Sequence, residues 1–203
     1  YIEPGGLDYG ATCAESVQTM ADNYVLSTSN MFAWAVAILI IFIGIHCLSR
    51  SMQGEEKPGS DLAGLASVFA LLAAGIAIVS LGIDTTVGEK ESSWVAQGGD
   101  VVQAHALSSA IGRGVFMLNG VVMLFLGLAI VRQKNLNLIL GAFTGLFGLL
   151  LLIGGVIPAG DPGLDSTTAI EAVGGILWFI GFLGWFVTTM VIGGFIIKQA
   201  RST

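Results

Sequence analysis

Charged residues are scarce in this 203-residue chain: Asp, Glu, Lys and Arg together make up 11% of it, whereas hydrophobic residues make up 54%. A soluble domain carries about 25% charged residues, so most of the surface of this chain must face something other than water. Basic residues are fewer than acidic ones: the chain has eight Lys and Arg residues and fourteen Asp and Glu residues, which gives a net charge of −6. This balance argues against a nucleic-acid partner, which needs clustered basic residues.

Cysteine and histidine each occur only twice, and two cysteines cannot form a disulfide framework. We expect His46 near the inner end of the first apolar span and His105 just before the third, on the outer side. Two rings at different depths cannot share one haem iron. Cys13, outside, and Cys47, at the inner rim, complete no metal cluster. The sequence therefore predicts no catalytic, cofactor or metal site unless another subunit contributes ligands, and bound lipids are the expected ligands.

Long apolar runs are what the chain does have, and two of them form a hairpin. The run Val115–Val131 is followed by the short basic turn Arg132-Gln133-Lys134-Asn135 and then by the run Leu136–Ile157. At 1.5 Å per helical residue, each run is long enough to cross a hydrocarbon core of roughly 30 Å. The hairpin thus predicts an integral membrane protein with a tight basic turn on the cytoplasmic side.

The whole chain is predicted to be all-α: a polytopic transmembrane helical bundle preceded by an acidic segment, residues 1–30, outside the cytoplasm. Within that segment the spacing favours a helix over residues 11–24. Ser29-Asn30 and Asp61 are expected to cap the first two spans. Residues 31–203 form the transmembrane domain, with spans over about 31–48, 62–83, 107–131, 136–157 and 172–197.

Charge asymmetry predicts the orientation of these five spans. Six of the eight basic residues fall on one side, and eleven of the fourteen acids fall on the other side or at its rim. The positive-inside tendency then places the N-terminus outside and the C-terminus inside, in the plasma membrane of a prokaryote. Because the chain begins at Tyr1 rather than Met, we expect a cleaved signal peptide or a further span before it.

Glycine stripes predict how the spans pack. Lipid gives helices no hydrophobic reason to associate, so small residues that allow close backbone approach carry the packing information. Such residues recur at helical spacing in the third, fourth and fifth spans, and Ala66, Ala70 and Ala74 repeat in the second. The predicted packing glycines are Gly120, Gly127, Gly141, Gly145, Gly148, Gly155, Gly174, Gly181 and Gly184.

Two charged residues share the register of these stripes. Arg113 lies seven residues before Gly120, and Glu171 lies three before Gly174. We therefore expect an ion pair between Arg113 and Glu171, joined by Asp84, at the outer rim of the bundle. The alternative is an interfacial arginine that extends its charge to the lipid headgroups.

The stretch Leu124–Leu152, which reads LFLGLAIVRQKNLNLILGAFTGLFGLLLL, resembles a pattern of uncharacterised six-helix prokaryotic membrane proteins. In those proteins a span ends in a short basic turn, and a Leu-Gly pair opens a span rich in Gly and Leu. The resemblance implies a six-helix fold whose first helix precedes Tyr1. It implies no activity, and it transfers no functional residue.

These features favour a non-catalytic accessory or structural subunit that packs beside other membrane protein subunits in a larger complex. One alternative is a small transporter or channel with an acidic outer vestibule. A water-filled cavity lined by Asn119 and Thr188 would favour it. Another alternative is a subunit of an enzyme complex that shares a site with a partner chain, which a metal bound near His105 or Cys13 would favour.

Overall fold

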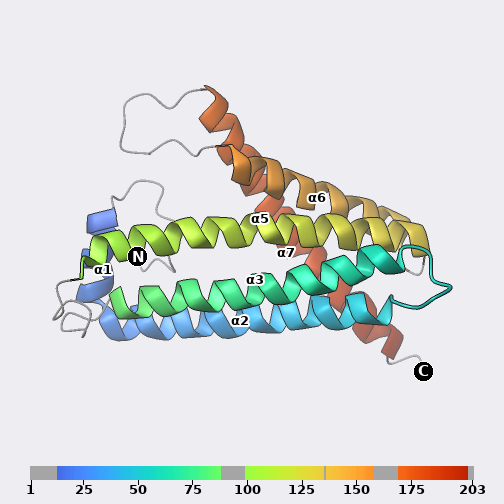
Figure 1. Ribbon diagram of the computed structural model, residues 1–203, viewed down its shortest axis with the longest axis horizontal. Coiled ribbons are helices and arrows are strands. Elements are labelled where there is room, and N and C mark those ends of the chain that lie inside the picture. Colours follow the sequence, from blue (N-terminus) through green and yellow to red (C-terminus); the bar gives the residue numbers. More distant parts are fainter. Residues whose placement is uncertain (1–12, 88–98, 135, 158–168, 201–203) are drawn as a thin grey trace. The chain divides into compact units, whose positions relative to one another are not determined.

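A computed structural model describes residues 13–87, 99–134, 136–157 and 169–200, and in these ranges the chain is helical with short connections (Figure 1). The predicted all-α fold is confirmed, and five of the six helices are long and apolar enough to cross a membrane. The helices are α1 (Cys13–Asp22), α2 (Tyr24–Ser51), α3 (Ser60–Val87), α5 (Val101–Gln133), α6 (Leu138–Val156) and α7 (Ala169–Ala200).

Most of these helices continue beyond the apolar runs. α2 and α3 each have 28 residues and α5 has 33, whereas about 20 residues suffice to cross the hydrocarbon core. As a result, two expected caps lie inside helices. Ser29 and Asn30 lie in the second turn of α2, where the Ser29 hydroxyl donates to the carbonyl of Val25. Asp61 lies in the first turn of α3 rather than before it.

Polar side chains mark the ends of α5 and α6. A carboxylate oxygen of Asp100 accepts hydrogen bonds from the backbone N–H groups of Val102 and Gln103, which starts α5 at Val101. Asn137 caps α6 in the same way by accepting from the N–H of Ile139. Between the two helices Lys134 adopts a left-handed backbone conformation, with φ of 53°, and this ends α5.

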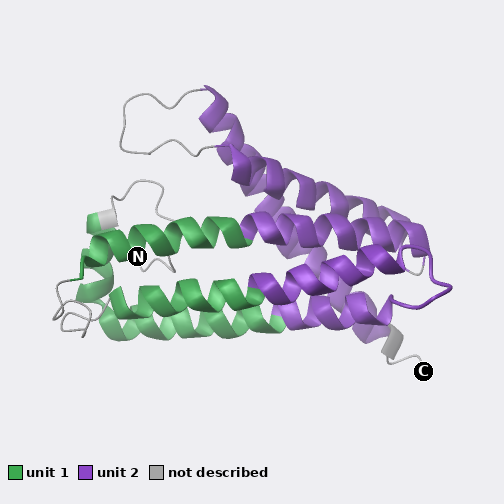
Figure 2. Ribbon diagram, in the orientation of Figure 1, with its two compact units in different colours: residues 1–40, 74–115, 160–167 green, residues 41–73, 116–159, 168–203 purple. Residues whose placement is uncertain are grey.

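The chain forms two compact units, and α2, α3 and α5 each contribute residues to both (Figure 2). Unit 1 comprises residues 1–40, 74–115 and 160–167. In its described part, Val17 and Met20 of α1 are buried against Met31 of α2, Val87 of α3 and Ala104 of α5. The amphipathic helix α1 is therefore held by its apolar face, as expected for a helix whose other face is polar.

Unit 2 comprises residues 41–73, 116–159 and 168–203, and backbone contacts at glycine hold its helices together. A Cβ on Gly127 or Gly148 would collide with backbone atoms of the facing helix in the α5–α6 pair. α7 runs antiparallel to α6, because Gly174 lies against Ile157 and Gly184 lies against Phe147. At eight of the nine predicted glycines an added Cβ would collide with a neighbouring helix or with Ile157: 120, 127, 141, 148, 155, 174, 181 and 184. At Gly145 an added Cβ would lie in ordinary contact, 3.9 Å from Gly127 and Leu124 of α5. Gly154, which the sequence did not indicate, would also collide.

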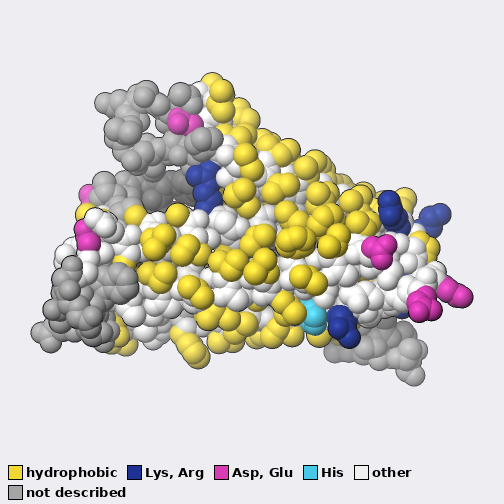
Figure 3. All heavy atoms as spheres, viewed as in Figure 1, with side chains coloured by type: hydrophobic (Ala, Val, Ile, Leu, Met, Phe, Trp, Pro, Cys, Tyr) yellow, Lys and Arg dark blue, Asp and Glu magenta, His cyan; other side chains and the backbone are white. Residues whose placement is uncertain are grey.

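Two turns lie at the same end of unit 2. The side-chain amide of Gln133, at the end of α5, donates to the carbonyl of Met52 in the α2–α3 turn. Gly59 of that turn has a φ of 78° and lies close to Ala129 and Arg132 of α5, where a side chain would be both strained and crowded. Charged side chains gather around these turns (Figure 3): Arg50, Glu55, Glu56, Lys57, Asp61, Arg132 and Lys134.

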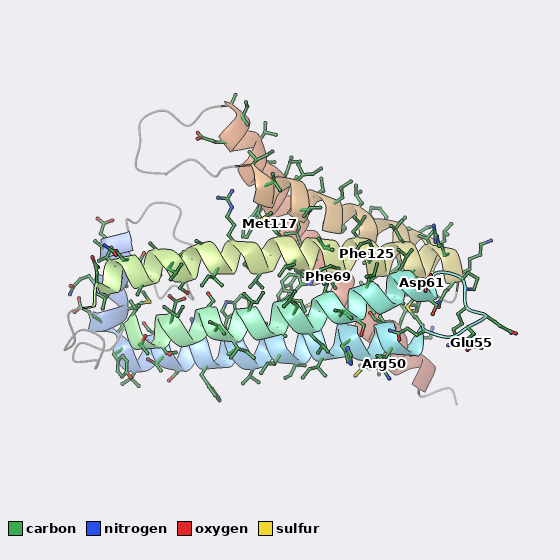
Figure 4. The ribbon with its side chains drawn as sticks, in the orientation of Figure 1. Arg50, Glu55, Asp61, Phe69, Met117 and Phe125 are labelled. Carbon is green, nitrogen blue, oxygen red and sulfur yellow. The ribbon has the colours of Figure 1, made fainter. Side chains whose placement is uncertain are left out.

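Aromatic side chains pack against one another between the helices of unit 2, where Trp185 is buried and the others are half-buried. Phe69 of α3 and Phe125 of α5 stack with ring centroids 6.0 Å apart (Figure 4). On α7, Trp178, Phe182 and Trp185 surround Phe116 of α5, with the closest centroids 5.4 Å apart. Edge-to-face and offset aromatic pairs of this kind add stabilisation beyond the area they bury.

Candidate functional site

A buried acid and a histidine meet between α3 and α5 in unit 1. The Nδ1 atom of His105 lies 3.1 Å from a carboxylate oxygen of Asp84. The relative exposure of the two side chains is 3% for His105 and 7% for Asp84. We call this contact the Asp84–His105 dyad. Its two members are the only buried titratable side chains among the residues that the structure describes.

A serine pair lies one helical turn from the dyad on the same two helices. The hydroxyls of Ser80 and Ser108 are 2.8 Å apart, and each hydroxyl lies 2.9 Å from the backbone carbonyl of the other residue. Both serines are buried. Because positions four or three apart share a helix face, the serine pair and the dyad form one polar strip between α3 and α5.

The sequence did not predict this strip, because both titratable residues fall outside the apolar runs. The second run ends at Ile83 and the third begins near Leu107, so the apolar pattern places Asp84 and His105 in a polar outer loop and at its edge. The structure continues α3 to Val87 and starts α5 at Val101, which places both residues inside helices. The signal that was available was the pairing of Ser80 with Asp84, and of His105 with Ser108, at helical spacing.

In the structure the carboxylate of Asp84 contacts a histidine, which the sequence did not predict. Asp84 bonds to His105, and neither Arg113 nor Glu171 is without an interaction. Arg113 belongs to unit 1 and Glu171 to unit 2. An ion pair between Arg113 and Glu171 therefore stays a prediction.

The other histidine is engaged in unit 2. The hydroxyl of Ser67 on α3 lies 2.7 Å from Nδ1 of His46 on α2, and both residues lie in the same unit. Cys47 beside it is a free, exposed thiol, whereas the side chain of Cys13 lies outside the described residues. Within the described ranges no group of three or more His, Cys, Asp or Glu residues could hold a metal ion.

Asn119 and Thr188, which the sequence singled out together, have different environments. The Thr188 hydroxyl donates to the carbonyl of Gly184 on its own helix, at 2.7 Å. Both side-chain amide atoms of Asn119 are buried without a hydrogen-bond partner among the described residues, and the same holds for the indole N–H of Trp185. Asn119 lies one turn from Phe116, whose ring contacts that of Trp185, so both groups border the aromatic cluster of unit 2.

Long apolar helices, glycine contacts between them and a buried polar strip define an α-helical integral membrane protein. No protein-family model matches the chain, and neither does any curated protein or solved structure. Its chemistry must therefore be argued from its own residues. The dyad offers an acid and a base within hydrogen-bond distance, and the serine pair offers hydroxyls that are already bonded to each other.

Proposed function

We propose that this chain is a non-catalytic accessory subunit that packs laterally within a larger membrane protein complex, in the plasma membrane of a prokaryote. The supporting observation is a set of glycines on open helix faces. Gly44, Gly75, Gly82 and Gly194 are exposed, and a Cβ on any of them would meet no described atom within 4 Å. These glycines have no packing role against the part of the chain that the structure describes.

Lipid explains an apolar helix face but does not explain glycine on it. Glycine in a helix interior costs about 1 kcal/mol relative to alanine. The inward glycines compensate for that cost by letting backbones touch, as Gly127 does against α6. An exposed glycine compensates in the same way only when a helix from another chain approaches it. We therefore infer that transmembrane helices of a partner cover these faces.

The experiment is native electrophoresis of the protein after mild solubilisation from its source membrane, with mass spectrometry of every co-migrating chain. We expect the wild type to migrate in a large assembly of constant composition. A variant that carries Gly75→Leu and Gly82→Leu should leave that assembly, because both residues lie on one face of α3 and leucine prevents close approach. The purified double variant should keep the thermal stability of the wild type in detergent, since nothing described lies within 4 Å.

Val79→Leu is the matched control on the same exposed face, because it enlarges a residue that already carries a side chain. This variant should remain in the assembly. Migration of the wild type alone or as a small homo-oligomer would contradict the proposal. Retention of the double glycine variant in the assembly would remove the observation on which it depends.

The alternatives remain a transporter or channel and a subunit that shares an enzyme site. The Asp84–His105 dyad favours the first of them, since buried ionisable residues in membrane helices commonly serve proton or ion pathways. A flux assay in liposomes tests that alternative directly: transport by the purified chain would replace the accessory role. The resemblance to six-helix prokaryotic membrane proteins adds no functional argument.

A further inference from the structure

The short helix α1 lies over the end of the polar strip in unit 1. Val17 and Met20 are the two buried side chains in the described part of α1, and they share one apolar cluster with Val87 of α3 and Ala104 of α5. Figure 1 shows α1 at the end of unit 1 at which α3 ends and α5 begins. The contact that holds α1 is therefore made with the same two helices that carry the strip.

The apolar cluster lies one helical turn from the dyad. Val87 is three residues after Asp84 on α3, and Val101, which packs against the cluster, is four residues before His105 on α5. Residues three or four apart share a helix face, so the cluster continues the face of the strip toward the helix ends. Below it the dyad has a relative exposure of 7% for Asp84 and 3% for His105.

α1 is built as a small, separately attached element. It has ten residues, and isolated helices shorter than about 12–15 residues are marginal in water, so its stability depends on the contact made by Val17 and Met20. Asn23, which is exposed, is the single residue that separates α1 from α2. Segments with few buried apolar side chains are the ones that open locally while the rest of a fold stays intact.

We propose that α1 is a hinged cap over the polar strip. It pivots at Asn23 and lifts its apolar face from α3 and α5, and water and small polar solutes then reach the dyad. Beyond the serine pair the α3 residues Ala73, Ala74 and Ala77 are buried and apolar, so the opening reaches the strip and goes no further. This role does not depend on the accessory function proposed above.

The test is the rate at which a small water-soluble methanethiosulfonate modifies single cysteines in the full chain in lipid nanodiscs. Cys13→Ser and Cys47→Ser remove the native thiols. Ala104→Cys then reports on the cluster beneath α1, and Ala77→Cys reports on α3 beyond the serine pair; the two alanines are similarly buried, at 7% and 4% exposure. Ala104→Cys should react about tenfold faster or more, since only this position is uncovered when α1 lifts.

Weakening the apolar contact of α1 should open the cap further. Val17→Ser together with Met20→Ser should speed the modification of Ala104→Cys by about tenfold or more, because both buried apolar side chains of the described part of α1 are lost. The same pair of substitutions should leave the rate at Ala77→Cys unchanged, since that position lies outside the contact with α1.

Ala14→Ser together with Thr19→Ser is the matched control, because it places two serines on the exposed part of α1. It should leave both rates within about twofold of their starting values. Equal rates at the two reporters with α1 unaltered would overturn the proposal, since α1 would then be a fixed part of the fold. Equal acceleration of both reporters by the buried substitutions would also overturn it, because unit 1 as a whole would have loosened. If those substitutions prevent folding, the comparison with α1 unaltered still decides.

Discussion

At the scale of single residues, Asn119 stands out because it is 1% exposed and neither of its amide atoms has a described partner. A buried polar group without a hydrogen bond costs about 1–3 kcal/mol. Serine and threonine avoid that cost in a helix by bonding back to a carbonyl, as Thr144 does to Leu140. Asparagine has two polar atoms, and here neither atom finds such a partner.

We expect Asn119→Leu to raise the free energy of unfolding by about 1–3 kcal/mol, because leucine has the same branching at Cγ and leaves no polar atom unpaired. Reversible unfolding in detergent, followed by circular dichroism, measures the change. Thr144→Val is the control: it removes a bonded hydroxyl and should change stability by about 1 kcal/mol or less. A less stable Asn119→Leu protein would contradict this prediction.

At the scale of helices, the backbones of α5 and α6 come close together at Gly127. A Cβ at Gly127 would overlap backbone atoms of Gly141 and Gly145, and backbone cannot move aside as a flexible side chain can. We expect Gly127→Ala to lower the free energy of unfolding by about 1–3 kcal/mol or more through overpacking. The same unfolding measurement in detergent tests this.

Gly82→Ala is the matched variant on α3, where an added Cβ meets nothing described within 4 Å. It should leave stability unchanged or raise it by up to about 1 kcal/mol, through helix propensity alone. Equal destabilisation by the two alanine variants would mean that steric contact does not distinguish the two positions.

The existence of the helices followed from the sequence more readily than their ends did. Apolar runs of about 20 residues leave few alternatives to a spanning helix, because backbone groups in lipid must bond within their own segment. Hydropathy does not detect a helix that continues into polar residues, and for that reason the dyad was missed. Gly154 was missed because it faces Trp178 of α7, whereas the predicted stripe contained Gly155.

At the scale of the whole molecule, the basic residues support one prediction about orientation. Within unit 2 the α2–α3 turn and the α5–α6 turn lie at one end, and the antiparallel course of α7 brings Lys198 to the same end. Five basic residues thus share that end: Arg50, Lys57, Arg132, Lys134 and Lys198. The positive-inside tendency predicts that this end is cytoplasmic.

Single-cysteine labelling in intact cells or right-side-out vesicles tests the orientation. After Cys13→Ser and Cys47→Ser, a Lys57→Cys variant should react with a membrane-impermeant maleimide only when the cytoplasmic face is opened. An Asn23→Cys variant, exposed between α1 and α2, should react without opening. The reverse pattern of labelling would invert the topology.

The glycine contacts also limit how far this sequence can change during evolution. At positions 127 and 148 every substitution adds at least one carbon where the facing backbone already lies, so descendants of this chain must keep glycine there or move two helices at once. Gly75 and Gly82 carry no such constraint from the described residues of their own chain. If they nevertheless stay fixed among descendants, the selection that fixes them acts through another molecule.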